Sequence, residues 1–271
     1  MADFALVLEY DGAPFIGWQR QGVGISVQEV LETAAARLNG GAPVAAIAAG
    51  RTDAGVHAAA QVVGLTLAAD FAPARLRDAL NFHLKPHPVA VRAAAFAPAG
   101  WSARFSAIGR AYRYIILNRA ARPALAAGRV WHVPHPLDAA AMHAAAQTLL
   151  GRHDFTSFRA RACQAKSPLR TLDRLDVTRD GEEIAIVAEA RSFLHHQVRN
   201  MVGTLKLVGE GRWRAADVAA ALAARDRARA GPTAPAAGLC LIGVRYPEGL
   251  DPFENLAENR PTVYLGPHRL M

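Results

Sequence analysis

Segments typical of strands alternate with segments typical of helices along this 271-residue chain, and this order limits the possible folds most strongly. Residues 4–10 are almost entirely apolar and predict a strand. Ser26, followed by Glu29, matches a capping box, so a helix is predicted from there to the glycine pair at 40–41. Pro73 predicts the start of a second helix.

The second part of the chain has a similar order with different spacing. Residues 112–117 predict a strand, and Asp138 predicts the N-cap of a helix. Residues 172–178 and 184–190 predict a hairpin, and residues 196–208 predict a buried helix. Because the chain shows neither a strict strand-helix-strand rhythm nor a repeat of fixed period, we expect the α+β class with an antiparallel sheet.

The predicted boundary between the two parts lies near residues 98–106. We therefore expect an N-terminal half at residues 1–104, which carries the acidic loop described below, and a C-terminal half at residues 105–246. Residues 247–271 lose hydrophobic periodicity and are predicted to form a C-terminal tail.

The chain is strongly basic, with a formal net charge of +8 and a pI of about 10.2. Lys and Arg together number 31, and only Lys85, Lys166 and Lys206 are lysines, so 28 of these residues are arginines. Arginine binds phosphate through a planar fork and stacks on bases, which indicates a nucleic-acid partner. A GC-rich genome also favours arginine and alanine, so charge alone leaves both explanations open.

Cysteine content and hydrophobic patterning exclude several classes of protein. Cys163 and Cys240 are too few and too far apart to predict a disulfide framework or a zinc site. The first residues lack the basic and apolar regions of a signal peptide, and no apolar run is long enough to span a bilayer. We expect a cytoplasmic protein that does not associate with membranes.

The segment Gly50-Arg51-Thr52-Asp53-Ala54-Gly55-Val56-His57 lies between two apolar stretches, residues 44–49 and 61–67, and is predicted to be a loop between strands. Glycines at both ends allow a tight turn and close approach of a ligand. Asp53 is the candidate catalytic side chain, and Arg51 could keep its carboxylate ionised. The alternative is an Asx-turn in which Asp53 bonds only to its own backbone.

This loop and six other segments together resemble the tRNA pseudouridine synthases of the TruA type. The resemblance covers about residues 4–246, in order and without large gaps. The other segments are Tyr10-Asp11-Gly12 with Gly17-Trp18-Gln19-Arg20-Gln21, Ala103-Arg104-Phe105-Ser106-Ala107, Arg110-Ala111-Tyr112-Arg113-Tyr114, Asp154-Phe155-Thr156-Ser157-Phe158, Ser192-Phe193-Leu194-His195-His196-Gln197-Val198-Arg199-Asn200, and Pro232-Thr233-Ala234-Pro235 with Gly238-Leu239.

The resemblance implies a fold, an activity and partners. The fold would be the pseudouridine synthase fold, in which two related ferredoxin-like or RRM-like halves share a central, mostly antiparallel sheet. The activity would be that of an isomerase that converts uridine to pseudouridine at positions 38, 39 and 40 of the tRNA anticodon stem-loop. The family needs no cofactor and no metal, and it works as a homodimer that binds tRNA.

The resemblance also implies the roles of individual side chains. Asp53 matches the nucleophilic aspartate, and Tyr112 matches the tyrosine that stacks on the target base. Arg199 matches the arginine that pairs with the catalytic carboxylate, and Arg51 matches an arginine implicated in base extrusion. From spacing alone, Tyr112 could instead pack on the sheet, and Arg199 could be a solvated helix residue.

Further basic side chains are predicted to bind RNA phosphates, which contribute affinity more than sequence readout. They are Arg104, Arg110, Arg159, Arg161 and Lys166, and the last three belong to a basic stretch around Phe155 and Phe158. Histidine pairs such as His195-His196 lack cysteines or carboxylates at metal-binding spacings, so no metal site is predicted.

Two alternatives to the enzyme remain at this stage. One is a catalytically silent RNA-binding protein on the same scaffold, and the other is a hydrolase or nuclease that uses Asp53 with histidines. The sequence departs from the family at Lys85-Pro86-His87-Pro88, where a Leu-Pro-x-Asp-like segment is expected. This departure puts local RNA contacts of that segment in question, and the chemistry is unaffected.

Overall fold

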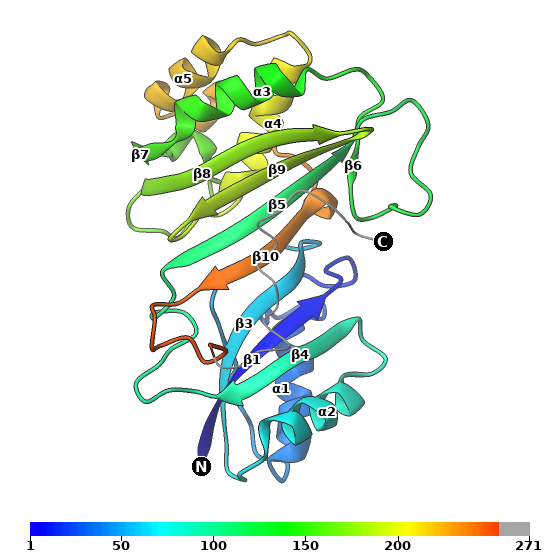
Figure 1. The fold of residues 1–271 in the computed structure, drawn as a ribbon, viewed down its shortest axis with the longest axis vertical. Helices are drawn as coiled ribbons and strands as arrows, with labels where there is room; N and C mark the ends of the chain where they lie inside the picture. Colours follow the sequence, from blue (N-terminus) through cyan, green and yellow to red (C-terminus); the bar gives the residue numbers. More distant parts are fainter. Residues whose placement is uncertain (255–271) are drawn as a thin grey trace. The chain divides into compact units, whose positions relative to one another are not determined.

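The computed structural model describes residues 1–254, and five α-helices and ten strands lie in this range. The ten-stranded sheet is mostly antiparallel, so the predicted α+β class is confirmed (Figure 1). The described chain divides into two compact units, one made of residues 1–110 and 241–254, the other of residues 111–240. No helix within residues 1–254 is both long enough and apolar enough to cross a membrane.

The first unit contains three long strands and two helices. In chain order its elements are β1 (Ala2–Tyr10), α1 (Val27–Leu38), β2 (Ile47–Ala48), β3 (His57–Leu67), α2 (Pro73–Leu84) and β4 (Val89–Phe96). Strand β1 lies between β4 and β3 and pairs antiparallel with both, with Phe4 opposite Leu65 and Phe96. Strand β2 pairs with β3.

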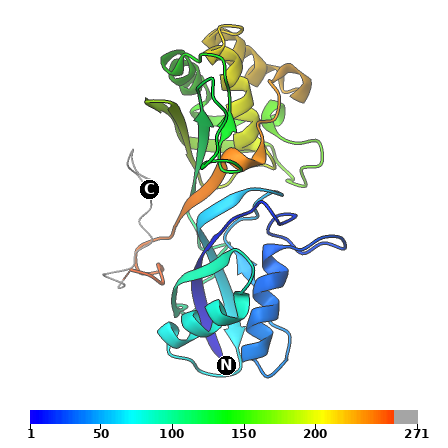
Figure 2. The same ribbon diagram turned by 90° about the vertical axis from the view of Figure 1, so that its right-hand side faces the viewer.

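Local sequence signals explain where these helices begin. The Ser26 hydroxyl accepts a hydrogen bond from the Glu29 N–H at 3.1 Å, which confirms the predicted cap of α1. Pro73 begins α2, as predicted. The Asn81 side chain binds both the N–H and the C=O of Val91, so α2 is tied to β4. Figure 2 shows α1 beside the strands of this unit.

An apolar cluster of the first unit includes residues from the C-terminal part of the chain, which explains why the chain returns to this unit. Val7, Val62 and Ala93 pack there with Tyr246 and Phe253. The sequence predicts a C-terminal half at residues 105–246, whereas the two compact units meet after residue 110, and residues 241–254 lie in the first unit. In the described part of the predicted tail, residues 247–254, Phe253 joins this cluster, and residues 255–271 lie outside the described range.

The second unit contains three α-helices and its own strands. Its elements are β5 (Gly109–Leu117, which starts in the first unit), β6 (Trp131–His132), α3 (Ala139–Ala146), β7 (Gly151–Asp154), β8 (Leu169–Asp180), β9 (Glu183–Ala190), α4 (Gln197–Gly209) and α5 (Ala215–Ala224). Strand β10 (Leu239–Arg245) starts here and ends in the first unit. Short 3-10 helices occur at Gln147–Leu149, Thr156–Phe158, Arg227–Arg229 and Ala236–Gly238.

The strands of this unit run in the order β5-β9-β8-β7, and β6 lies parallel to β5. The predicted hairpin is confirmed, with Asp180 opposite Glu183 around a tight turn. Asp138 caps α3 by accepting the Ala141 N–H at 2.9 Å, as predicted. Helix α4 is buried along nearly its whole length and packs on α3, which contacts β8 (Figure 1).

Candidate active site

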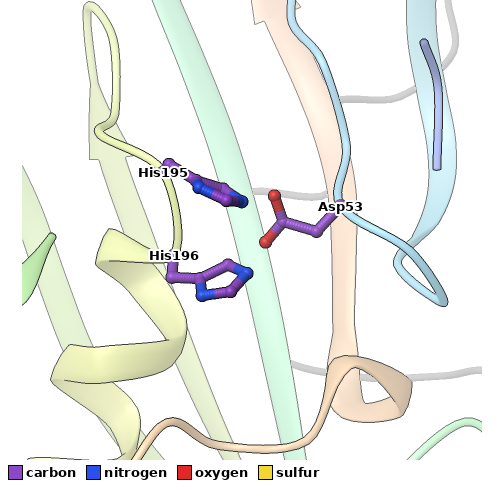
Figure 3. A group of neighbouring side chains, drawn as sticks. All are labelled: Asp53, His195 and His196. Atoms are coloured by element: carbon purple, nitrogen blue, oxygen red, sulfur yellow. The ribbon is translucent and has the colours of Figure 1, made fainter. Parts of the chain in front are cut away.

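Asp53 lies in the first unit, on the loop that joins β2 to β3 (Figure 3). The predicted placement of the Gly50–His57 segment between two strands is confirmed, with His57 as the first residue of β3. The Val56 N–H donates to the Asp53 carbonyl at 3.1 Å, and Gly55 has a φ of 74°, so the loop turns tightly after Asp53. The Asp53 side chain is half-buried.

A second loop, which follows β1, supports the Asp53 loop through hydrogen bonds between their backbones. The Trp18 N–H donates to the Thr52 carbonyl at 3.0 Å, and the Gly55 N–H donates to the Phe15 carbonyl at 3.3 Å. A Cβ on Gly17 would lie 2.7 Å from the Thr52 carbonyl oxygen, and φ at Gly17 is 108°. Only glycine at this position allows the two loops to approach so closely.

Buried polar side chains fix the start of the Asp53 loop. The Tyr10 and Thr52 hydroxyls are 2.8 Å apart, and the Gln61 amide donates to the Gly50 carbonyl at 2.7 Å. Both Gln61 and Thr52 are buried. Gln61 was not predicted as a site residue, although a glutamine within the apolar run of β3 is a signal that could have found it.

Arg110 links this loop to the segment after β4. Its guanidinium donates to the Ala49 carbonyl at 2.7 Å, to the Arg104 carbonyl at 2.8 Å and to the Ala107 carbonyl at 3.0 Å. These contacts give Arg110 a positioning role that sequence reasoning missed. Its predicted phosphate contact stays a prediction.

His57 closes the other end of the Asp53 loop. It is buried, and its Nδ1 lies 3.1 Å from both the Gly12 N–H nitrogen and an Asp11 carboxylate oxygen. The Tyr10-Asp11-Gly12 segment therefore contacts both ends of the Asp53 loop: Tyr10 bonds to Thr52, and Gly12 bonds to His57.

In the second unit, Tyr112 lies near the start of β5 with its side chain buried. The Tyr112 and Phe193 rings form a T-shaped contact, with centroids 5.3 Å apart and an angle of 86° between the planes. Phe193 comes from the segment that leads into α4, so two of the predicted motifs meet here. The predicted stacking of Tyr112 on a base stays a prediction.

Arg199 lies on the first turns of α4, and its backbone and side chain both bind the segment 232–235. Its Nε–H donates to the Ala234 carbonyl at 2.8 Å, and its own carbonyl accepts the Ala234 N–H at 3.1 Å. The Tyr114 hydroxyl donates to the Pro235 carbonyl at 2.8 Å. Burial raises the pKa of Tyr114 far above its usual range, against the opposing charge of Arg199, so this donor keeps its proton.

Asn200, beside Arg199, connects several segments of the second unit. It is fully buried, and its amide donates to the Phe158 carbonyl at 2.8 Å. Its Oδ1 accepts from Thr233 at 2.7 Å and from Arg227 at 3.1 Å. Sequence reasoning assigned no role to Asn200 or Arg227.

His195 and His196 lie at the turn that leads into α4, with ring centroids 4.0 Å apart (Figure 3). His196 has a φ of 62°, and its carbonyl accepts the Asn200 N–H at 2.9 Å, so it starts the helix. The His195 carbonyl accepts the Ala160 N–H at 2.9 Å. These contacts tie the pair into the start of α4 and into the segment that contains Ala160.

A family model described as tRNA pseudouridine synthase matches residues 6–106 and 145–247. The chain belongs to this family. The matched ranges contain the Asp53 loop and Arg199, whereas Tyr112 lies between them. The resemblance found in the sequence is therefore confirmed, and the roles of individual residues stay predictions.

Curated relatives support the same membership. The tRNA pseudouridine synthase A of Acidiphilium cryptum is 71% identical over 254 residues, which cover 93% of this chain and 99% of the relative. The protein of the same name from Rhodospirillum centenum is 63% identical over 247 residues, which cover 91% of this chain and 100% of the relative. The protein of the same name from Paramagnetospirillum magneticum is 62% identical over 246 residues, which cover 91% of this chain and 96% of the relative.

The remaining side chains predicted to bind RNA differ in exposure. Arg51, Arg104, Arg161 and Lys166 are exposed, and Arg159 is half-buried. Phe155 and Phe158, around which the basic stretch was predicted, are fully buried and belong to the core of the second unit. Their rings are therefore packed in the protein interior beneath the segment that carries Arg159, Arg161 and Lys166, and they are not accessible to a ligand.

Proposed function

We propose that this chain is an isomerase that converts uridine to pseudouridine in tRNA, with Asp53 as the nucleophile. Family membership over nearly the whole chain carries the proposal, together with the position of Asp53 on a matched loop that buried contacts hold in place. We extend the proposal to positions 38, 39 and 40 of the anticodon stem-loop.

The reaction requires no change of oxidation state. The bond between N1 of the base and C1′ of the ribose breaks, the base rotates, and C5 bonds to C1′. The hydrogen of C5 leaves as a proton, and N1 takes up a proton from the surroundings. A carboxylate suits this sequence because it can add to an intermediate and then leave. Since the product has the same atoms as the substrate, the reaction consumes no co-substrate.

Other predicted residues receive roles within the same proposal. Tyr112 would stack on the extruded uracil, which offsets part of the free energy of unstacking. Arg199 would stabilise the ionised form of the catalytic carboxylate, and Arg51 would assist extrusion. The exposed basic residues Arg104, Arg161 and Lys166 would contact phosphates. We also propose a homodimer that acts on tRNA in the cytoplasm.

The Asp53→Asn variant tests the central role. We expect turnover to fall on the order of 1,000-fold or more, because an amide is a poor nucleophile, while tRNA affinity stays largely unchanged. The assay measures tritium released from tRNA whose uridines carry the label at C5, and mapping of pseudouridine in the product identifies the position. Asp70→Asn, at an exposed residue of the same unit, is the control and should keep wild-type turnover.

Two outcomes would contradict the proposal in different ways. Retained tritium release by Asp53→Asn would remove Asp53 as the nucleophile. If the wild-type protein bound tRNA but released no tritium, it would be a catalytically silent binder.

A further inference from the structure

A single aromatic side chain, Phe105, projects from the segment that follows β4 in the first unit. Its side chain is 79% exposed, although burial would stabilise a phenyl ring by about 2 kcal/mol or more. The segment 101–107 otherwise contributes to the core, since Ala103 and Ala107 are buried in the apolar cluster with Tyr246. An exposed phenyl ring on a well-packed segment is available to a ligand.

The backbone beneath Phe105 is held in place. The Ser106 N–H donates to the Ser102 carbonyl at 3.0 Å, and the Ser102 N–H donates to the Ser106 hydroxyl at 3.0 Å. The Tyr246 hydroxyl donates to the Ala103 carbonyl at 2.7 Å, and burial raises the pKa of this tyrosine, so the donor stays protonated. A ring presented on such a segment loses little entropy when it binds.

Charge around this ring favours an anionic partner. The Arg104 guanidinium lies over the Phe105 ring, with its central carbon 5.6 Å from the ring centroid. Within the first unit, residues 79–110 contain no acidic residue, whereas they contain one lysine and three arginines: Lys85, Arg92, Arg104 and Arg110. An aromatic ring beside arginine within such a stretch matches the combination that binds single-stranded nucleic acid, a stacking surface with a cation for the backbone.

Arg110 connects this segment to the proposed catalytic loop. Its guanidinium binds the Arg104 carbonyl and the Ala49 carbonyl at once, and Ala49 immediately precedes the Gly50–His57 loop. Both groups belong to the first unit, so the position of Phe105 relative to the loop is set by hydrogen bonds. A base held by Phe105 would be held at a defined place relative to Asp53.

We propose that Phe105 stacks on an unpaired base of the substrate RNA other than the target uridine, while Arg104 binds an adjacent phosphate. This inference rests on the proposed function, because it assumes that tRNA is the ligand. It assigns to Phe105 a role in positioning the substrate, separate from the chemistry at Asp53.

The test compares Phe105→Ala, Phe105→Leu and Phe105→Trp by equilibrium binding of an unmodified tRNA transcript. Alanine should weaken binding about tenfold, because stacking contributes on the order of 1–3 kcal/mol per base. Tryptophan should restore most of the affinity, and leucine should not, because leucine is apolar but has no π-face. In turnover assays the alanine variant should change KM more than kcat.

Phe82→Ala is the matched control, since Phe82 is also an exposed phenylalanine of the first unit, 70% exposed on α2. It should bind the transcript as the wild type does. Sedimentation of the Phe105 variants reports whether the ring instead contacts a second copy of the chain.

Three results would overturn the inference: unchanged binding by Phe105→Ala, full restoration by leucine, or loss of self-association in the alanine variant. Tritium release by the wild-type protein is measured in parallel. A protein without that activity whose Phe105 variants still follow the predicted order would contradict the proposed function and leave the stacking role intact.

Discussion

At the scale of single residues, Asn200 shows how one polar side chain holds a predicted site residue in place. Its amide group satisfies the Phe158 carbonyl, the Thr233 hydroxyl and the Arg227 guanidinium inside the second unit. Arg199, the next residue back along α4, binds the segment that also contains Thr233. The position of Arg199 therefore depends on contacts that Asn200 maintains.

We predict that Asn200→Ala lowers the free energy of unfolding by about 3 kcal/mol, because buried partners lose their hydrogen bonds without gaining water. Urea denaturation followed by circular dichroism measures this loss. Gln164→Ala, at an exposed loop residue of the same unit, is the control and should change stability by less than about 0.5 kcal/mol. A loss below about 1 kcal/mol for Asn200→Ala would show that solvent or neighbouring groups replace its bonds.

At the scale of elements, two loops pack backbone against backbone to form the support of Asp53. A Cβ added at Gly12 would lie 2.0 Å from the Val56 carbonyl oxygen, and one added at Gly17 would lie 2.7 Å from the Thr52 carbonyl oxygen. Because the obstructing atoms are backbone, neither contact can be relieved by a side-chain rotation. The glycines at these positions are therefore required by packing between loops.

We predict that Gly12→Ala lowers the free energy of unfolding by about 2 kcal/mol and reduces turnover on the order of tenfold or more, because the Asp53 loop must shift. Gly22→Ala is the matched control, since a Cβ there meets nothing within 4 Å. Thermal unfolding and tritium release together measure both effects. Wild-type turnover by a stably folded Gly12→Ala protein would contradict the proposed support.

At the scale of the whole molecule, the net charge of +8 predicts how tRNA affinity depends on salt. Phosphate contacts release counterions, so the logarithm of the affinity should fall linearly with the logarithm of the salt concentration.

Arg161→Ala should reduce the steepness of that line by about 0.7–0.9, the change expected for one lost phosphate contact. Filter binding between about 50 and 200 mM salt measures the slope. Arg37→Ala, at an exposed arginine in the last turn of α1, should leave the slope unchanged. If the two variants changed the slope equally, general charge and not a contact at Arg161 would account for the salt dependence.

Local signals in the sequence were sufficient to predict most helices and strands and the position of the Asp53 loop between two strands. The caps at Ser26 and Asp138, the helix start at Pro73 and the β8–β9 hairpin were all predicted and are all present. These features depend on hydrogen bonds and backbone preferences within a few residues, so nearby sequence specifies them. The resemblance to the tRNA pseudouridine synthases likewise came from short motifs, and the family comparison confirmed it.

Only the tertiary structure decided which distant groups hold the site together. The contacts of Gln61 with Gly50, Arg110 with Ala49, and Asn200 with Thr233 join residues that no local pattern relates. The return of the chain after Leu241 to the first unit has the same origin, because Tyr246 and Phe253 complete an apolar cluster formed by remote strands. Such contacts form only once the chain has folded, since each buried polar or apolar group then takes the partner that the packed strands and helices bring to it.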